Sequence, residues 1–350
     1  MARSVRVTIG EIFSHRIFFA AQQHAHNGVV SCLSTEIGGS PPQVYSGGDD
    51  SQVKIYSLMA NPQTLPGSAS LEPMSNTNMN DQVKSMTMIE GCLFCGLNAG
   101  RIVAFRKADA ATFQLGAAGQ DGHTGAVLSI LQWGTHVISG SWDATVRFWT
   151  YNQGNFTCEL ALPVNHPVTA LCIIQDTILV CACNGAIVYV SLPNLQAPQG
   201  PPTVVNRIQL PNETATGAVA YHDHAIVSFL SGRICVYDAN GVEKFNSGNS
   251  PQGPMNGITC IEGIVDSNGQ EFLVAGENNG SISLYKLPSF EKAISFEAHA
   301  SRKEVRALKF LQSGFFLSCD AAGEIRVIRA CQTHEDSQAA GGMMDGGGLM

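Results

Sequence analysis

A cysteine pair at residues 92–95 is the first motif in this sequence whose spacing could do chemistry. Cys92 and Cys95 have the C-x-x-C spacing of zinc sites and of redox-active dithiols. The segment that contains them is expected to be a β-strand, in which side chains three positions apart face opposite sides. No second Cys/His pair with matching spacing follows. We therefore expect buried structural thiols here.

Two histidine pairs could also bind a metal ion. His222 and His224 flank Asp223, and His24 and His26 enclose an alanine. A zinc site needs at least three protein ligands, and no third ligand accompanies the first pair. We expect residues 222–224 to form an exposed loop, and His26 to have the structural role described below. The sequence predicts no metal site.

Catalytic motifs of the common enzyme classes are missing from the sequence. There is no G-x-S-x-G nucleophile elbow, no P-loop, and no G-x-G-x-x-G between a strand and a helix. The glycine-rich segment 116–122 is expected to be a plain connection. We therefore predict a protein that is not an enzyme, with no catalytic residues and no cofactor.

The composition favours a strand-and-turn protein. Charged residues make up 14% of the 350, there are 36 glycines, and the net charge is −8. This charge disfavours a broad phosphate-binding surface and direct nucleic-acid binding. No apolar run approaches the roughly 18 residues of a membrane span. The 11 cysteines, scattered along apolar segments, suit a reducing compartment. We expect the cytoplasm, with the nucleus as the alternative.

The stretch SGSWDATVRFWT (139–150) reads as strand, tight turn and strand. After the turn, Val146 and Phe148 point to one side and Arg147 and Trp149 to the other. The pattern recurs along the whole chain at intervals close to the roughly 40–45 residues of a propeller blade. Its copies lie at 46–57, 95–106, 139–150, 181–190, 229–238, 275–286 and 318–329.

A further strand pattern lies upstream of each turn, so each copy predicts one four-stranded blade. The sequence therefore predicts an all-β fold, a single seven-bladed β-propeller. After 324–328 the last blade lacks a fourth strand, whereas the strand pattern at 16–20 precedes the first blade without a partner. We predict that 16–20 completes the last blade and closes the ring. The propeller would span 1–334, followed by a disordered Gly/Met-rich tail at 335–350.

The third copy, with GHTGAVLSI before VISGSWDATVRFW, resembles WD40-repeat proteins. In that family a His, a Ser or Thr, an Asp and a Trp form a hydrogen-bonded chain. The matching residues here are His123, Ser139, Asp143 and Trp149. The first copy keeps His26 and Asp50 but has Tyr56 in place of the tryptophan.

The remaining copies depart from this pattern. Most replace the network with N-G-type turns that rely on glycine. At the aspartate position they carry Ala99, Asn184, Ser231, Asn279 and Ala322, and the glycines that follow are Gly100, Gly185, Gly232, Gly280 and Gly323.

A narrower resemblance is to the propeller half of plant-type CCCH zinc-finger WD40 proteins. It is carried by CGLNAGRIVAFRK (95–107), the third copy, and the segment from SISLYK (281–286) to GEIRV (323–327). Those proteins have an RNA-binding C-x₈-C-x₅-C-x₃-H finger ahead of the propeller, and this sequence has no such spacing. The resemblance implies that the finger is absent, or is supplied in trans by another chain.

Candidate binding residues lie on the predicted loop face. Trp142 occupies a tight turn, where it either lies over neighbouring loops or is an exposed anchor for a partner. Its counterparts in other copies include Asp49, Asn98 and Asn278. The segment 301–309 adds a basic group on the same predicted face, which is either solvated charge or a site for an acidic peptide or RNA. The group consists of Arg302, Lys303, Arg306 and Lys309.

These observations predict a non-catalytic scaffold for protein–protein interactions, a monomeric propeller within a larger complex. The zinc-finger-family likeness favours a subunit of an RNA-associated regulatory complex in mRNA metabolism or translation. The alternatives are a ubiquitin-ligase substrate receptor, or direct RNA binding through the basic group. Pro/Gly/Ser-rich segments at 60–81, 194–203 and 246–257 are expected to be surface loops.

Overall fold

The fold is built from β-strands throughout the part of the chain that the computed structural model describes. The described residues are 4–5, 15–36, 41–60, 69–107, 111–116, 122–152, 155–192, 200–248, 257–265, 269–312 and 315–332. Within these ranges every regular element is a strand, so the predicted all-β class is confirmed. No helix in the same ranges is long and apolar enough to cross a membrane. The predicted tail at 335–350 lies outside them.

The strands form seven antiparallel units of four, with two of the units joined into one eight-stranded sheet by a parallel contact between Leu115 and Phe156. The innermost strands of the units are β3 (Val30–Glu36), β7 (Val83–Ile89), β11 (Val127–Trp133), β15 (Val168–Ile174), β19 (Ala215–Tyr221), β23 (Ile258–Val265) and β27 (Val305–Gln312). The second strands are β4 (Gln43–Gly48), β8 (Cys92–Leu97), β12 (His136–Ser141), β16 (Thr177–Ala182), β20 (His224–Phe229), β24 (Glu271–Glu277) and β28 (Phe315–Asp320).

The third strands are β5 (Gln52–Ala60), β9 (Ile102–Arg106), β13 (Thr145–Asn152), β17 (Ala186–Ser191), β21 (Ile234–Asp238), β25 (Ser281–Lys286) and β29 (Glu324–Gln332). The outer strands are β6 (Ala69–Asn78), β10 (Thr112–Leu115), β14 (Asn155–Pro163), β18 (Thr203–Gln209), β22 (Glu243–Asn246), β26 (Glu291–Glu297) and β2 (His15–His24). We number the units 1 to 7 in the order of their innermost strands.

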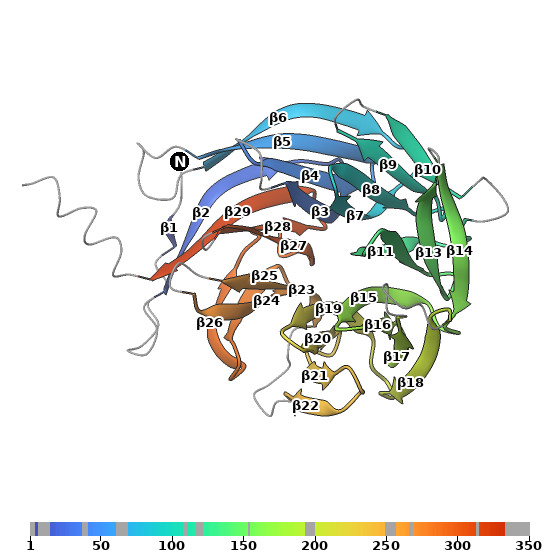
Figure 1. The fold of residues 1–350 in the computed structure, drawn as a ribbon. Coiled ribbons are helices and arrows are strands. Elements are labelled where there is room, and N and C mark those ends of the chain that lie inside the picture. Colours follow the sequence, from blue (N-terminus) through green and yellow to red (C-terminus); the bar gives the residue numbers. More distant parts are fainter. Residues whose placement is uncertain are drawn as a thin grey trace, which may run out of the picture.

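The seven units are arranged in a ring, as the repeat predicts (Figure 1). Each innermost strand contacts the innermost strands of the units before and after it, and β27 contacts β3. The apolar core lies between neighbouring units: Phe94 and Ile102 of unit 2 pack in one cluster with Val137 and Trp149 of unit 3. A unit therefore buries both faces only when it has a neighbour on each side.

The ring closes through the N-terminal strand. β2 runs antiparallel to β29, with Ile17 opposite Ala330 and His24 opposite Glu324. A short strand, β1 (Ser4–Val5), pairs with the other edge of β2. The predicted closure by the N-terminal strand is therefore present: the last unit takes its outer strand from the start of the chain.

One predicted loop is in part a strand. Residues 69–78 were expected to belong to a surface loop but form β6, the outer strand of unit 1, paired with β5. Most of its side chains are exposed, because an outer strand packs on one side only. Its Pro, Ser and Asn residues therefore look like a loop in the sequence.

The glycine turns predicted for five units have the expected backbone. Gly100 and Gly323 have φ values of +92° and +91°, a region that side chains with a Cβ rarely adopt. A Cβ at Gly323 would also collide with the carbonyl oxygen of His26. The glycine thus lets the turn of unit 7 approach the connection that leads into unit 1.

Candidate functional site

A chain of hydrogen bonds joins the turn and strands of unit 3. Trp149 Nε1 donates to Ser139 Oγ at 2.8 Å. Ser139 Oγ lies 2.7 Å from His123 Nε2, and His123 Nδ1 lies 2.9 Å from Asp143 Oδ2. A carboxylate only accepts, so Nδ1 carries the proton and Ser139 donates to Nε2. The chain satisfies every polar atom of a buried imidazole.

Burial sets the protonation of this network. Desolvation lowers the pKa of His123, although the hydrogen bond to Asp143 opposes it. Burial also opposes ionisation of Asp143, but hydrogen bonds from His123 and Thr145 outweigh that effect and hold its pKa below the usual value. The histidine is therefore neutral and the aspartate ionised near neutral pH. These residues stabilise the turn that carries Trp142.

Unit 1 has a similar arrangement without the tryptophan. His26 Nδ1 lies 2.7 Å from Asp50 Oδ1, and its Nε2 lies 2.8 Å from Ser46 Oγ. Desolvation lowers the pKa of His26, as it does for His123. Tyr56 is buried at the position of Trp149.

Trp142 is exposed on the loop face, the side of the ring that carries the turns between second and third strands. Its side chain is 52% exposed, which makes it one of the most accessible large apolar residues of the described chain. Its backbone is fixed, because Trp142 N donates to Ala126 O at 2.8 Å and Asp143 N donates to Ser141 Oγ at 3.1 Å. A rigid turn therefore presents an exposed aromatic side chain.

Leu230 is a second exposed apolar residue on this face. It occupies the matching turn of unit 5 and is 48% exposed. Cys183 takes the same position in unit 4 and is half-buried. We call Trp142, Cys183 and Leu230 the apolar arc, because they lie on three consecutive units.

The other turn positions on this face are mostly polar. Asn98 and Asn278 are exposed at the turns of units 2 and 6. Asp49 in unit 1 is held by Lys84, whose Nζ lies 2.7 Å from Asp49 Oδ1. Among the turn positions, the apolar side chains are therefore concentrated on one side of the face.

The predicted basic group does not form one surface. Arg302 and Lys303 lie exposed in the connection between β26 and β27. Arg306 instead follows Val305, which is opposite Asp320 at the start of β27, and lines the central channel. Lys309 lies further along the strand, opposite Leu317. The expected gathering on one face was wrong, because two of the four residues lie in the connection and two on the innermost strand, where Arg306 lines the channel.

Carboxylates offset most of these basic charges. Arg302 Nε lies 3.6 Å from Glu297 Oε1, and Arg306 pairs with Glu304. Lys309 Nζ lies 3.5 Å from Glu262 Oε2 on β23 of the neighbouring unit. Three of the four cations are therefore paired with a carboxylate, which leaves less positive charge for a phosphate backbone.

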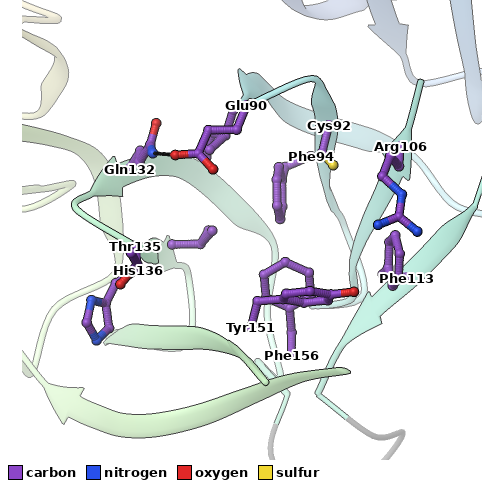
Figure 2. Close-up of a pocket in the computed structure, with 12 residues that line it drawn as sticks. Glu90, Cys92, Phe94, Arg106, Phe113, Gln132, Thr135, His136, Tyr151 and Phe156 are labelled. Carbon is purple, nitrogen blue, oxygen red and sulfur yellow. Dashed lines mark hydrogen bonds between the residues drawn. The ribbon is translucent and has the colours of Figure 1, made fainter. Parts of the chain in front are cut away.

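A pocket of about 370 Å³ opens on the opposite face, between units 2 and 3 (Figure 2). Glu90 and Thr135 line this pocket. They lie in the turns between first and second strands, just before β8 and β12 begin, which places the pocket on the side of the ring opposite the loop face. Phe113, Tyr151 and Phe156 pack edge-on or tilted against one another in its wall. The pocket is aromatic on one side and polar on the other.

Cys92 and Cys95 both lie on β8, and Cys95 is a fully buried free thiol. Burial raises the pKa of the Cys95 thiol well above its usual value, so it is a poor nucleophile. His222 lies in the turn between β19 and β20, with its Nε2 3.2 Å from Glu271 Oε2. Neither the cysteine pair 92/95 nor the histidine pair 222/224 belongs to a group of three metal-ligating side chains among the described residues.

Comparison with known proteins agrees with this architecture. The family model described as "WD domain, G-beta repeat" matches residues 19–57 and 117–150, which hold the networks of units 1 and 3. The crystal structure of the WD40 beta propeller domain of Doa1 is similar, with a TM-score of 0.69 and 15% sequence identity. The match covers 93% of this chain and 99% of that one. No curated protein sequence matches significantly.

The chain thus has the WD40 β-propeller fold, and two of its segments match the WD-repeat family model.

Proposed function

We propose that this protein is a non-catalytic scaffold that binds partner proteins through the apolar arc on its loop face. The observation that carries the proposal is the pair of exposed apolar side chains, Trp142 and Leu230, held on rigid turns. Exposed tryptophan is the residue type most enriched among the energetic anchors of protein interfaces.

The turns favour binding because they are already ordered. The backbone at Trp142 is fixed by hydrogen bonds to Ala126 and Ser141, and the buried His123–Asp143 pair supports the turn from below. A partner therefore meets a surface that loses little conformational freedom on binding. The rest of the loop face offers polar residues such as Asn98 and Asn278, which suit the rim of an interface.

We further propose that the partners belong to an RNA-associated regulatory complex in the cytoplasm or the nucleus. The support is the likeness of several segments to the propeller half of CCCH zinc-finger WD40 proteins. A zinc-finger chain acting in trans would then supply the contact with RNA. The ion pairs of Arg302, Arg306 and Lys309 speak against direct RNA binding. The residues after Trp149 depart from the Asp-x-Arg run of many ubiquitin-ligase receptors.

The test compares partner recovery by single-residue variants of the full chain. Trp142→Ala and Leu230→Ala are each tagged, expressed in the native cell, and analysed by affinity purification with mass spectrometry. Val205→Ala is the matched control, because Val205 is 58% exposed but lies on the outer strand β18. We expect both arc variants to lose partners at unchanged melting temperature, and the control to keep them. An anchor truncation of this kind costs about 2 kcal/mol or more of binding free energy.

Further variants separate the alternatives. If Arg302→Glu with Lys303→Glu does more damage than Trp142→Ala, and nuclease treatment dissolves the complex, the protein binds RNA directly. Retention of all partners by the arc variants would refute the proposed surface. Loss of partners from Tyr151→Ala in that case would move the binding site to the pocket of the opposite face.

A further inference from the structure

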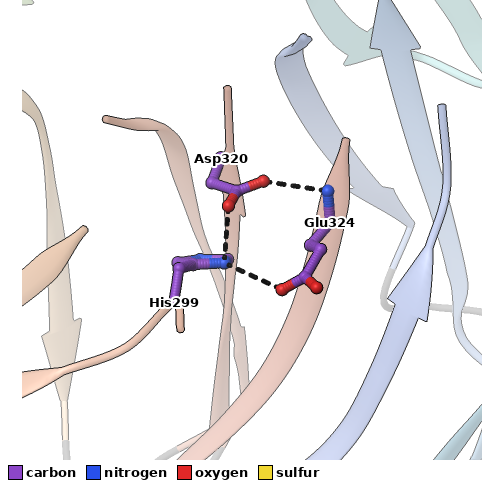
Figure 3. A group of neighbouring side chains, drawn as sticks. All are labelled: His299, Asp320 and Glu324. Carbon is purple, nitrogen blue, oxygen red and sulfur yellow. Dashed lines mark hydrogen bonds and ion pairs between the residues drawn. The ribbon is translucent and has the colours of Figure 1, made fainter. Parts of the chain in front are cut away.

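Three titratable side chains converge in unit 7, at the position of the His–Asp network of units 1 and 3 (Figure 3). His299 comes from the connection before β27, Asp320 ends β28, and Glu324 begins β29. His299 and Asp320 are fully buried, and the side chain of Glu324 is 22% exposed. The sequence comparison of the repeats placed Ala322 at the aspartate position and did not find this group.

His299 Nδ1 is buried and makes no hydrogen bond. It points at two carboxylates, 3.4 Å from Asp320 Oδ2 and 3.8 Å from Glu324 Oε2. Both distances are beyond a good N–H···O hydrogen bond. The other ring nitrogen, Nε2, lies 2.9 Å from Ser318 Oγ. The contact with Ser318 thus fixes the imidazole ring at Nε2, and Nδ1 faces the oxygen atoms of two carboxylates.

Unit 7 contains one carboxylate more than the network of unit 3 needs. In unit 3 a single carboxylate, Asp143, lies 2.9 Å from the histidine, and Thr145 follows it. The sequence position of Thr145 corresponds to Glu324 in unit 7. Asp320 takes over the role of anchoring the turn, because its Oδ1 accepts from the backbone of Ala322 and Glu324 at 3.0 and 2.9 Å. Glu324 is therefore not required to satisfy the histidine or the turn.

The charges of the group do not balance. Asp320 and Glu324 contribute two negative charges, and Arg326, with its Nη2 3.3 Å from Glu324 Oε2, offsets one of them. A buried uncompensated charge is costly, so the group favours a further cation.

We propose that His299 Nδ1, Asp320 Oδ2 and Glu324 Oε2 form a binding site for one Zn²⁺ ion. Zinc takes histidine and carboxylate ligands at roughly 2.0–2.2 Å in a tetrahedral arrangement, which places neighbouring ligand atoms about 3.3–3.6 Å apart. The observed Nδ1-to-oxygen distances of 3.4 and 3.8 Å are close to this spacing. The buried imidazole disfavours Mg²⁺ and Ca²⁺, which prefer oxygen ligands.

The atoms around the ligands hold them in place. Ser318 fixes the His299 ring, and Ser301 Oγ donates to Asp320 Oδ2 at 2.6 Å. Gln22 Nε2 donates to Glu324 Oε1 at 3.1 Å. Such supporting contacts orient metal ligands in proteins. Because Gln22 lies on β2, the ion would bind at the junction between the last unit and the strand that closes the ring.

The test uses the full-length chain, stripped of metal with a chelator that is then removed. Zn²⁺ is titrated against a competing chromophoric chelator, with Mg²⁺ as the negative control. We expect one Zn²⁺ per chain from this site and a rise of about 5 °C in melting temperature at a hundredfold excess over Kd. Mg²⁺ should produce neither effect. Co²⁺ in place of Zn²⁺ should show tetrahedral visible bands without a thiolate charge-transfer band, which excludes the cysteines as ligands.

Glu324→Thr is the decisive variant, since it installs the hydroxyl that unit 3 carries at Thr145. We expect it to fold and to weaken Zn²⁺ binding at least about tenfold, with loss of the thermal shift. Asp320→Asn should also weaken binding. Asp50→Asn, in the network of unit 1, is the matched control and should keep the Zn²⁺ affinity within about twofold.

If the unmodified chain binds no Zn²⁺, or if Glu324→Thr and Asp320→Asn bind it as tightly as the unmodified chain, the proposal is wrong. The His299 proton would then be shared between the two carboxylates.

Discussion

Three buried histidines in this propeller lie beside carboxylates, and the geometry differs between them. In units 1 and 3 the carboxylate lies 2.7 and 2.9 Å from Nδ1 of His26 and His123. In unit 7 the nearest carboxylate oxygen is 3.4 Å from Nδ1 of His299. The first two are closed hydrogen-bond networks, whereas in the third Nδ1 makes no hydrogen bond. The same position in the repeat thus holds a hydrogen-bonded histidine in units 1 and 3 and a histidine with an unpaired Nδ1 in unit 7.

The closed networks predict a loss of stability in mild acid. Burial lowers the pKa of His26 and His123, so both stay neutral in the folded chain. The unfolded chain binds protons at these residues below about pH 6.5, which favours unfolding as the pH falls from there toward the folded pKa values. The lowered pKa of Asp50 and Asp143 acts only below about pH 4. Between pH 7.5 and 5 each histidine should cost at most about 2 kcal/mol.

Urea unfolding at pH 7.5 and pH 5 checks this prediction. The double variant His26→Asn with His123→Asn should be less stable than the unmodified chain at pH 7.5. It should lose less further stability on acidification, because two of the titrating groups are gone. Equal losses in both proteins would show that other groups cause the acid sensitivity.

The sequence predicted the network of unit 3, because all four family residues stand at their usual spacing. It missed the group in unit 7, because Asp320 lies two positions before the family aspartate in the aligned repeats. Asp320 therefore does not match the family pattern, although its side chain lies beside His299. It also misplaced Lys309, whose partner Glu262 lies on a neighbouring strand 47 residues away. Contacts of this kind depend on the packing of units, which the repeat pattern does not encode.

At the scale of elements, the turn glycines determine how closely successive units approach. Gly323 has φ +91°, and a Cβ there would meet the carbonyl oxygen of His26. Gly91, in the turn between β7 and β8, has φ +75° but faces open space. A side chain at either position would strain the backbone, but only at Gly323 would it also collide with another atom. Comparing the two positions therefore separates backbone strain from steric collision.

We predict that Gly323→Ala destabilises the protein more than Gly91→Ala does. Gly91→Ala should cost about 1 kcal/mol, the usual strain of a left-handed backbone with a side chain. Gly323→Ala adds a collision with backbone, which cannot move as a side chain does, so its cost should exceed about 2 kcal/mol. Chemical denaturation of both variants measures the difference. Similar costs would mean that the connection before unit 1 adjusts freely.

The sequence predicted inner strands better than outer ones. Strands inside a unit, such as the second strand β16, are buried on both faces and appear in the sequence as continuous apolar runs. The outer strand β6 is mostly exposed, and its residues gave the appearance of a loop. Burial creates the apolar signal, so strands that bury little produce a weak one.

For the whole molecule, the repeat interval was sufficient to predict a ring, since a single unit cannot bury both of its faces. The ring is held closed at one place by pairing between the two ends of the sequence, β2 and β29. The apolar arc could not be predicted as a surface, because its members lie about 45 residues apart and only the ring brings them to one face.

The closure predicts that deleting residues 1–21 opens the propeller. This removes most of β2 and exposes the edge of β29, whose residues from Val327 to Gln332 would lose their partners. An exposed strand edge pairs readily with other chains. We expect the 22–350 chain to melt at a lower temperature and to oligomerise in size-exclusion chromatography. Deletion of 335–350 is the matched control and should change neither property.

A variant that keeps the strand but weakens its pairing tests the same closure without truncation. Ala21 lies opposite Val327 in the pairing of β2 with β29, and a proline there would remove a backbone donor and fix the local φ. Ala21→Pro should therefore reproduce part of the loss caused by the truncation. A monomeric 22–350 chain with unchanged melting would show instead that the other six units hold the ring together without β2. The contact between β27 and β3 would then be the main closure.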